Sequence, residues 1–190
     1  SGNLEYLVCS LPLLQFSANE DIKRRTLQTF TFYYGKPVEQ EQVLTVLNEI
    51  CFPFLSQEQQ SIFSSLHYYD DTLICEIPTG VLNDYYTALD ELKTKLMQFR
   101  IQRKNSKQTK DESVLGLSGT PLEQEIQLMK LQWTLLDDID TVDFASFEAL
   151  CIYKLRLMIL LRYWSFSEER GFTLLLESTN PYRKGGNHVG

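Results

Sequence analysis

The sequence lacks every spacing that would identify a catalytic centre or a nucleotide site. Its glycines form neither GxGxxG nor GxxxxGKS/T, the loops that cradle phosphates. Its two histidines, His67 and His188, lie far apart, which argues against a His-based metal site and against a Ser-His-Asp arrangement. We therefore predict a non-enzyme without metal or cofactor, and we infer no small-molecule ligand.

An excess of positive charge and long apolar runs are also missing. The net charge of −7 argues against nucleic acid or an anionic membrane as the main partner, because both need clustered Lys and Arg. The apolar run 157–161 is flanked by Arg156 and Arg162, whereas a membrane span needs about 20 nearly uncharged residues. The apolar stretch 7–14 is short and contains Pro12, so it is neither a span nor a signal peptide. We expect no direct membrane insertion.

The cysteines indicate a reducing compartment. No CxxC pair occurs, and a chain of 190 residues can bury a core without cross-links. We expect reduced, buried thiols and a cytoplasmic protein. The four residues are Cys9, Cys51, Cys75 and Cys151.

Apolar spacing and capping signals predict a fold that is all-α or nearly so. Ser56 with Gln59, and Thr120 with Glu123, have the spacing of capping boxes at helix starts. One short pair of extended segments, 6–9 and 73–77, is expected beside the helices. The predicted helices cover 22–34, 38–51, 56–69, 81–103, 120–137, 144–164 and 165–177, the last capped by Ser165 or Ser167.

A polar segment rich in Ser and Lys, 104–119, divides the chain. It separates an N-terminal helical lobe, 3–103, from a C-terminal helical hairpin, 120–178, and a polar tail, 179–190, follows. The prediction is a two-lobed helical bundle.

The long apolar stretch 144–171 carries the candidate partner contacts, since charged residues interrupt an otherwise buried pattern. Arg156 and Arg162 lie six residues apart and point in nearly opposite directions on one helix. Each arginine pairs with a carboxylate of the chain or reaches solvent, or else it docks a partner protein. The aromatic residues Tyr153 and Trp164 are either core or partner contacts.

The acidic cluster 137–143 fails as a calcium loop. Starting at Asp138, such a loop needs Gly at its sixth and Glu at its twelfth position, where this chain has Asp143 and Ala149. We interpret the cluster as a solvated loop between helices whose last Asp caps a helix. Less favoured is an enzyme site built from these carboxylates and Glu76.

Two stretches resemble a bacterial family of unknown function. Residues 6–12, YLVCSLP, are similar to its opening YLVASLP. Residues 147–171, from FEAL through RYW to EERG, resemble its "EALL…YxLKLxILxRW…F…EKG" region. The order and spacing of these motifs run through most of the chain, and the motifs are structural rather than catalytic.

The resemblance implies a role beside a V/A-type (vacuolar-type) ATPase, because genes of this family usually lie in operons for that complex. The implied role is a non-catalytic accessory or structural subunit, or an assembly factor, that contacts the central stalk or membrane rotor. Such a protein would lie peripherally on the inner face of the membrane through the complex. The helical C/d-type subunit is the natural analogy, although it is normally about twice this length with three similar lobes. The rival is a free-standing adaptor that binds a peptide or partner helix in a groove between its lobes.

Overall fold

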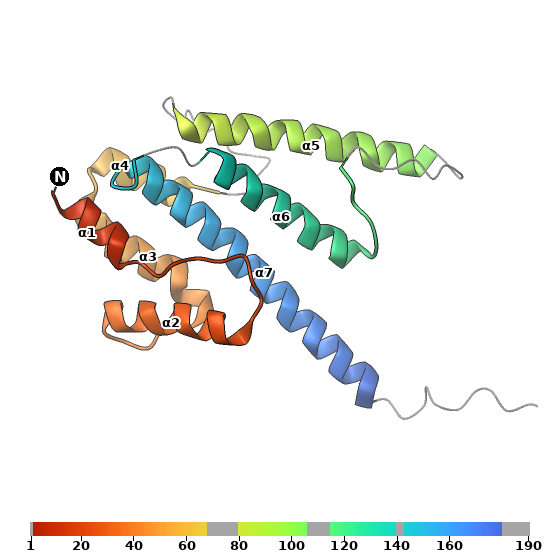
Figure 1. The fold of residues 1–190 in the computed structure, drawn as a ribbon, viewed down its shortest axis with the longest axis horizontal. Helices are drawn as coiled ribbons and strands as arrows, with labels where there is room; N and C mark the ends of the chain where they lie inside the picture. The colour runs from red at the N-terminus through yellow and green to blue at the C-terminus, as the bar shows by residue number, and fades with distance from the viewer. Residues whose placement is uncertain (1, 68–79, 106–114, 140–142, 180–190) are drawn as a thin grey trace, which may run out of the picture.

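The protein is helical throughout the described part of the chain. The computed structural model describes residues 2–67, 80–105, 115–139 and 143–179, which contain helices and no strand (Figure 1). The all-α prediction is therefore confirmed. The elements are α1 (Gly2–Ser10), α2 (Glu20–Tyr34), η1 (Gln40–Gln42), α3 (Val43–Cys51), η2 (Phe52–Phe54), α4 (Gln57–Ser65), α5 (Val81–Asn105), α6 (Pro121–Ile139) and α7 (Phe147–Thr179).

The predicted strand at Tyr6–Cys9 is wrong, because these residues belong to α1. Leu7 and Leu11 are four residues apart and both buried, whereas Tyr6 is 71% exposed. A spacing of four puts two leucines on one face of a helix, and burial of that face outweighs the strand propensity of the segment. Pro12 then ends the helical hydrogen bonding. The other predicted extended segment, 73–77, lies outside the described residues.

The two predicted capping boxes are confirmed. The Ser56 hydroxyl accepts from the Gln59 amide at 3.2 Å, and the Gln59 side chain accepts from the Ser56 amide at 3.0 Å. Glu123 and Thr120 make the reciprocal pair at the start of α6, at 3.3 and 2.7 Å. Each box satisfies two backbone N–H groups that the first turn of a helix leaves without partners.

The expected break at Ser165 does not occur. A single helix of 33 residues, α7, runs through this position. The Ser165 hydroxyl donates to the Leu161 carbonyl one turn back, at 3.1 Å, and this bond is compatible with an uninterrupted helix. The cap of α7 is Ser146, whose hydroxyl accepts from the Ala149 amide at 3.1 Å.

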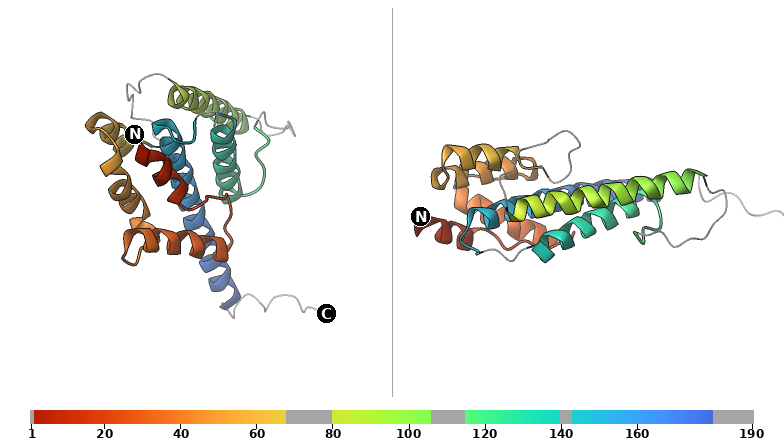
Figure 2. Two further views of the ribbon diagram at one scale, coloured as in Figure 1. Left: turned by 60° about the vertical axis from the view of Figure 1, so that its left-hand side comes forward. Right: turned by 90° about the horizontal axis from the view of Figure 1, so that it is seen from above.

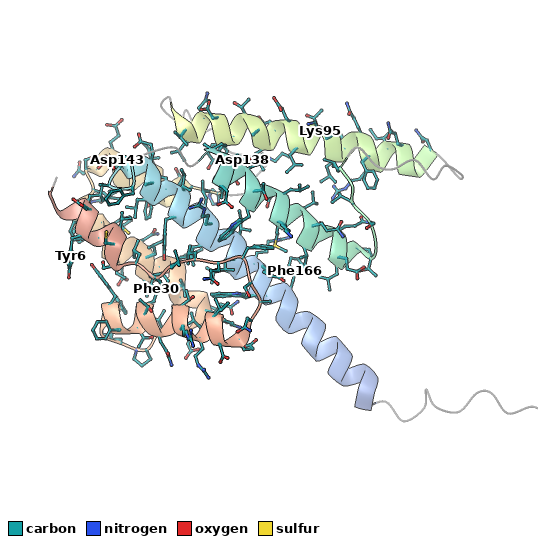
Figure 3. The ribbon with its side chains drawn as sticks, viewed as in Figure 1. Tyr6, Phe30, Lys95, Asp138, Asp143 and Phe166 are labelled. Carbon is teal, nitrogen blue, oxygen red and sulfur yellow. The ribbon has the colours of Figure 1, made fainter. Side chains whose placement is uncertain are left out.

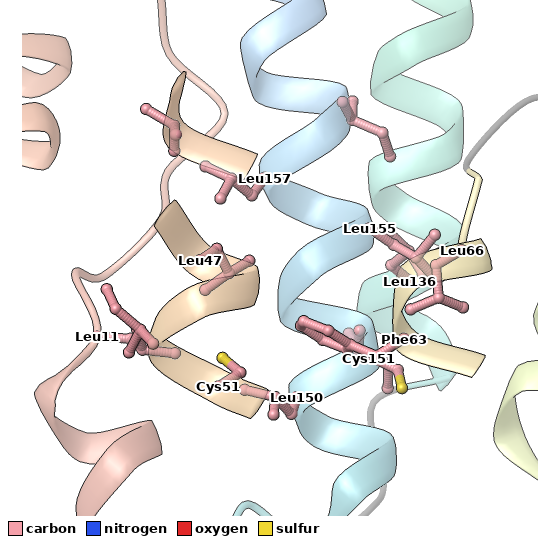
Figure 4. Close-up of a cluster of buried hydrophobic side chains, with 14 of the residues drawn as sticks. Leu11, Leu47, Cys51, Phe63, Leu66, Leu136, Leu150, Cys151, Leu155 and Leu157 are labelled. Atoms are coloured by element: carbon pink, nitrogen blue, oxygen red, sulfur yellow. The ribbon is translucent and has the colours of Figure 1, made fainter. Parts of the chain in front are cut away.

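The first half of α7 runs through the middle of the molecule, with α1, α2 and α3 on one side and α5 and α6 on the other (Figures 1 and 2). Figure 4 shows apolar side chains of α3 and α4 meeting α7 from two sides. One cluster of buried residues extends from Leu7 to Ile159 and draws on both predicted lobes. The two-lobe division itself stays a prediction. Within the described residues, no helix combines the length and apolar character needed to cross a bilayer.

Lys154 is the buried charged residue at the centre of this core, with 2% of its surface exposed. Its Nζ donates to the Phe63 carbonyl and lies 4.5 Å from the centroid of the Phe63 ring. Phe63 belongs to the last turn of α4, where carbonyls lack helical partners and carry the negative end of the helix dipole. Lys154 therefore caps α4 from within the core. Burial lowers the pKa of this amine from 10.5 to about 8.

We predict that Lys154 makes stability rise with pH above about 8. The unfolded chain, with the amine at its usual pKa of 10.5, binds more protons than the native state between about pH 8 and 10.5. Relative to Lys154→Met, the wild type should gain about 1–2 kcal/mol of unfolding free energy between pH 8 and about 9.5. Urea unfolding at several pH values measures this difference.

Lys95→Met is the matched control, because Lys95 is exposed on α5. Its unfolding free energy should follow that of the wild type at every pH. Parallel curves for wild type and Lys154→Met would contradict the assignment.

Candidate functional site

Two of the four predicted contact residues, Tyr153 and Trp164, make hydrogen bonds to the backbone of their own chain. The Tyr153 hydroxyl donates to the Pro12 carbonyl, and the Trp164 Nε1–H donates to the Ser17 carbonyl, both at 2.8 Å. Trp164 is 1% exposed, so of the two alternatives that the sequence left open it takes the core position and offers no surface to a partner here. Tyr153 packs against the main core, and burial raises its pKa well above the usual value. Both residues hold the irregular segment between α1 and α2 against α7.

Arg156 forms an internal ion pair. Its Nη2 lies 2.7 Å from the Asp137 carboxylate on α6, and its guanidinium carbon lies 6.0 Å from the Trp133 ring centroid. The arginine side chain is 21% exposed. Of the alternatives that the sequence left open, pairing with a carboxylate is the one realised here.

Arg162 is the exposed member of the four. Its side chain is 46% exposed, and its Nη2 lies 3.9 Å from Glu125 on α6, at the outer limit of an ion pair. Its guanidinium carbon lies 5.0 Å from the Phe166 ring centroid. Figure 3 labels Phe166 near the point where α7 leaves the other helices. Arg162 therefore marks the base of the projecting part of α7.

The core thiols are poor nucleophiles. Burial raises the pKa values of Cys51 and Cys151 to about 12, so both stay protonated at neutral pH. Both are free, as expected. Cys9 is free but exposed, which corrects the expectation that it is buried, because it lies on the outer face of α1. Cys75 lies outside the described residues.

The acidic cluster is divided between two helix ends. Asp137 pairs with Arg156, and the Asp143 side chain accepts from the Ala145 amide at 3.1 Å in a turn before α7. Asp143 is therefore not the helix cap that was predicted. Asp138 is exposed at the end of α6, whereas the other two carboxylates of the less favoured enzyme site, at 140 and at Glu76, lie outside the described residues. Among the described residues, no group of three His, Cys, Asp or Glu side chains could hold a metal ion.

A groove lies between α5 and α6, and the sequence did not indicate which residues line it. Its volume is about 650 Å³, and α5 and α6 form its two walls. Phe166 of α7 lines it as well. The side chains along it are mostly apolar, with charged groups at the edges: Leu96, Phe99, Arg100, Lys104, Leu117, Pro121, Leu122, Gln124, Glu125, Leu128 and Phe166.

The floor of this groove is a small hydrophobic cluster, separate from the main core. Leu96, Leu117 and Leu128 are its buried members. Leu117 comes from the segment just before α6, and Gln127 fixes that segment in place. The Gln127 amide accepts from the Ser118 N–H at 3.1 Å and donates to the Ser118 carbonyl at 3.0 Å. The groove therefore has ordered walls.

No related protein adds information on the groove or on the four predicted contact residues of α7. Comparison with protein-family models, with curated proteins and with solved structures gave no match. The family resemblance at residues 6–12 and 147–171 stays a prediction.

We predict that the two α7 arginines differ in their contribution to stability. Arg156→Ala should lower the unfolding free energy by about 1–2 kcal/mol, because it removes a charge-assisted bond and packing against Trp133. Arg162→Ala should change it by no more than about 0.5 kcal/mol, since its long ion pair is largely solvated. Chemical denaturation of both variants measures the difference, and equal losses would refute this account of the pairs.

Proposed function

We propose that the chain is a non-catalytic accessory or structural subunit, or an assembly factor, of a bacterial V/A-type ATPase. It acts by protein–protein contact with the central stalk or the membrane rotor. It lies in the cytoplasm, peripherally on the inner face of the membrane through the complex. The helical C/d-type subunit is the analogous component.

The observation that carries the proposal is that the two stretches resembling the family meet in space. The first contains the second half of α1 and Pro12, and the second forms most of α7. The Tyr153 hydroxyl on α7 donates to the Pro12 carbonyl, and Leu7 belongs to the same buried cluster as Leu150. The shared motifs thus occupy one structural unit at the centre of the fold, which supports a common fold with the family.

The shape of α7 supports a role by contact. Its first half is fixed in the core, and its C-terminal part extends beyond the other helices (Figures 1 and 2). The 13 residues at 167–179 would span about 20 Å as a helix. A helix held at one end by a packed core transmits force as a rigid lever. Such an element suits a part of a rotary complex.

The α5–α6 groove favours a second candidate function. An open, mostly apolar groove with two helical walls suits the binding of a peptide or partner helix. The protein would then be a free-standing adaptor without any link to the ATPase. The two candidates differ in which proteins accompany the chain in the cell.

We predict that the tagged protein, purified from its native membranes, retains V/A-type ATPase subunits in fixed stoichiometry at high salt. Mass spectrometry and native gels measure this. An assembly factor would accompany partial complexes only, whereas a structural subunit would accompany the intact enzyme.

Arg162→Glu tests whether the base of the projecting helix makes the contact. It should reduce retention of the ATPase several-fold, because it reverses an exposed charge there. Lys95→Glu reverses an exposed charge on α5 and is the matched control, expected to behave as wild type. Recovery of a folded wild-type protein without any ATPase subunit would overturn the proposal and leave the adaptor.

A further inference from the structure

Charge is unevenly distributed along α5. Its acidic residues, Asp84, Asp90 and Glu91, all precede position 92, and its basic residues all follow it: Lys93, Lys95, Arg100, Arg103 and Lys104. Positive charge near the end of a helix complements its dipole, which accounts for part of this pattern. Arg100 and Lys104, however, are exposed and line the groove as well.

The edge of the groove along α5 is therefore basic in a chain whose net charge is −7. In the described part of the chain, no carboxylate lies within ion-pair distance of Arg100 or Lys104. The opposite wall contributes one carboxylate, Glu125, and that residue faces Arg162 at 3.9 Å. As far as the described residues show, the groove thus combines an apolar floor with positive charge that no carboxylate pairs on one edge.

The dimensions of the groove suit about two turns of helix. Its α5 wall extends from Leu96 to Lys104, and its α6 wall from Pro121 to Leu128. Eight residues of helix correspond to about 12 Å. Helices in such grooves insert apolar side chains at i, i+3, i+4 and i+7, which also cover two turns.

We propose that this groove binds a short amphipathic helix of an acidic partner protein. The apolar stripe of that helix covers Leu96, Phe99 and Leu128, and carboxylates beside the stripe face Arg100 and Lys104. The bound helix would pack against both α5 and α6 and cover the apolar side chains between them. The inference deepens the second candidate function and holds whether or not the ATPase assignment is correct.

The test uses the full chain and two synthetic helix-forming peptides labelled with fluorescein. Both carry leucine at i, i+3, i+4 and i+7 in an Ala/Gln background. One carries glutamates beside the leucine stripe, and the other carries lysines at the same positions. Fluorescence anisotropy should show saturable binding of the glutamate peptide, at least about tenfold tighter than the lysine peptide, and weaker at high salt.

Charge reversal locates the site. Arg100→Glu should weaken the glutamate peptide about tenfold and strengthen the lysine peptide. Lys95→Glu makes the same change on the same helix, at a residue that does not line the groove, and should leave both affinities within about twofold. Hydrogen exchange with the glutamate peptide bound should slow at 96–104 and 117–128, which reports on the groove without any substitution.

Three outcomes would overturn the inference. These are equal affinity for the two peptides, no saturable binding, and an equal effect of Arg100→Glu and Lys95→Glu. Dodecanoate tests an acyl chain as the occupant. If dodecanoate saturates the groove and displaces the glutamate peptide at that same concentration, the groove would instead be assigned to an acyl chain. Co-purification with the ATPase is measured separately, so failure of either proposal leaves the other intact.

Discussion

The burial of the first half of α7 is the constraint on which the rest of the structure depends. A helix enclosed by other helices must satisfy each of its polar side chains inside the protein, since an unpaired buried polar group costs about 1–3 kcal/mol. Lys154, Tyr153 and Trp164 each do so by donating to a backbone carbonyl of another segment. One of these carbonyls lies in the last turn of α4, and two lie between α1 and α2. The same bonds that satisfy α7 therefore fix two distant parts of the chain around it, α4 and the segment between α1 and α2.

The groove follows from where α7 ends its contact with the other helices. Near its start, α7 packs together with α3, α5 and α6, so the apolar faces of those helices are covered. Beyond Phe166, α7 extends away from the facing ends of α5 and α6, and among the described residues only the short segment with Leu117 packs against these two ends. Two helices cannot enclose an apolar stripe by themselves. The small cluster around Leu96 and Leu128 therefore stays separate from the main core and lies open to a further helix.

Local chemistry explains what could be predicted from the sequence. The start and end of α2 were predictable because the Asn19 side chain accepts from backbone N–H groups there and Gly35 takes a left-handed conformation. The partners of Arg156 and Arg162 were not predictable, because Asp137 and Glu125 belong to a different helix and only tertiary packing brings them near. The residues that line the groove could not be identified from the sequence for the same reason. The stripe that includes Leu96 and Phe99 has the spacing of any core helix, and its sequence does not show where its neighbour departs.

The two contact surfaces are physically linked at the base of the projecting helix. Phe166 lines the groove, and the guanidinium of Arg162 lies over its ring. Arg162 also faces Glu125 on the groove wall through a long, half-exposed ion pair, which costs little to exchange for another carboxylate. An acidic helix in the groove would therefore compete with Glu125 for Arg162 and alter the charge presented where α7 projects. Occupation of the groove and contact along α7 would then be coupled, and the sign of that coupling would depend on whether the partner of α7 is acidic or basic.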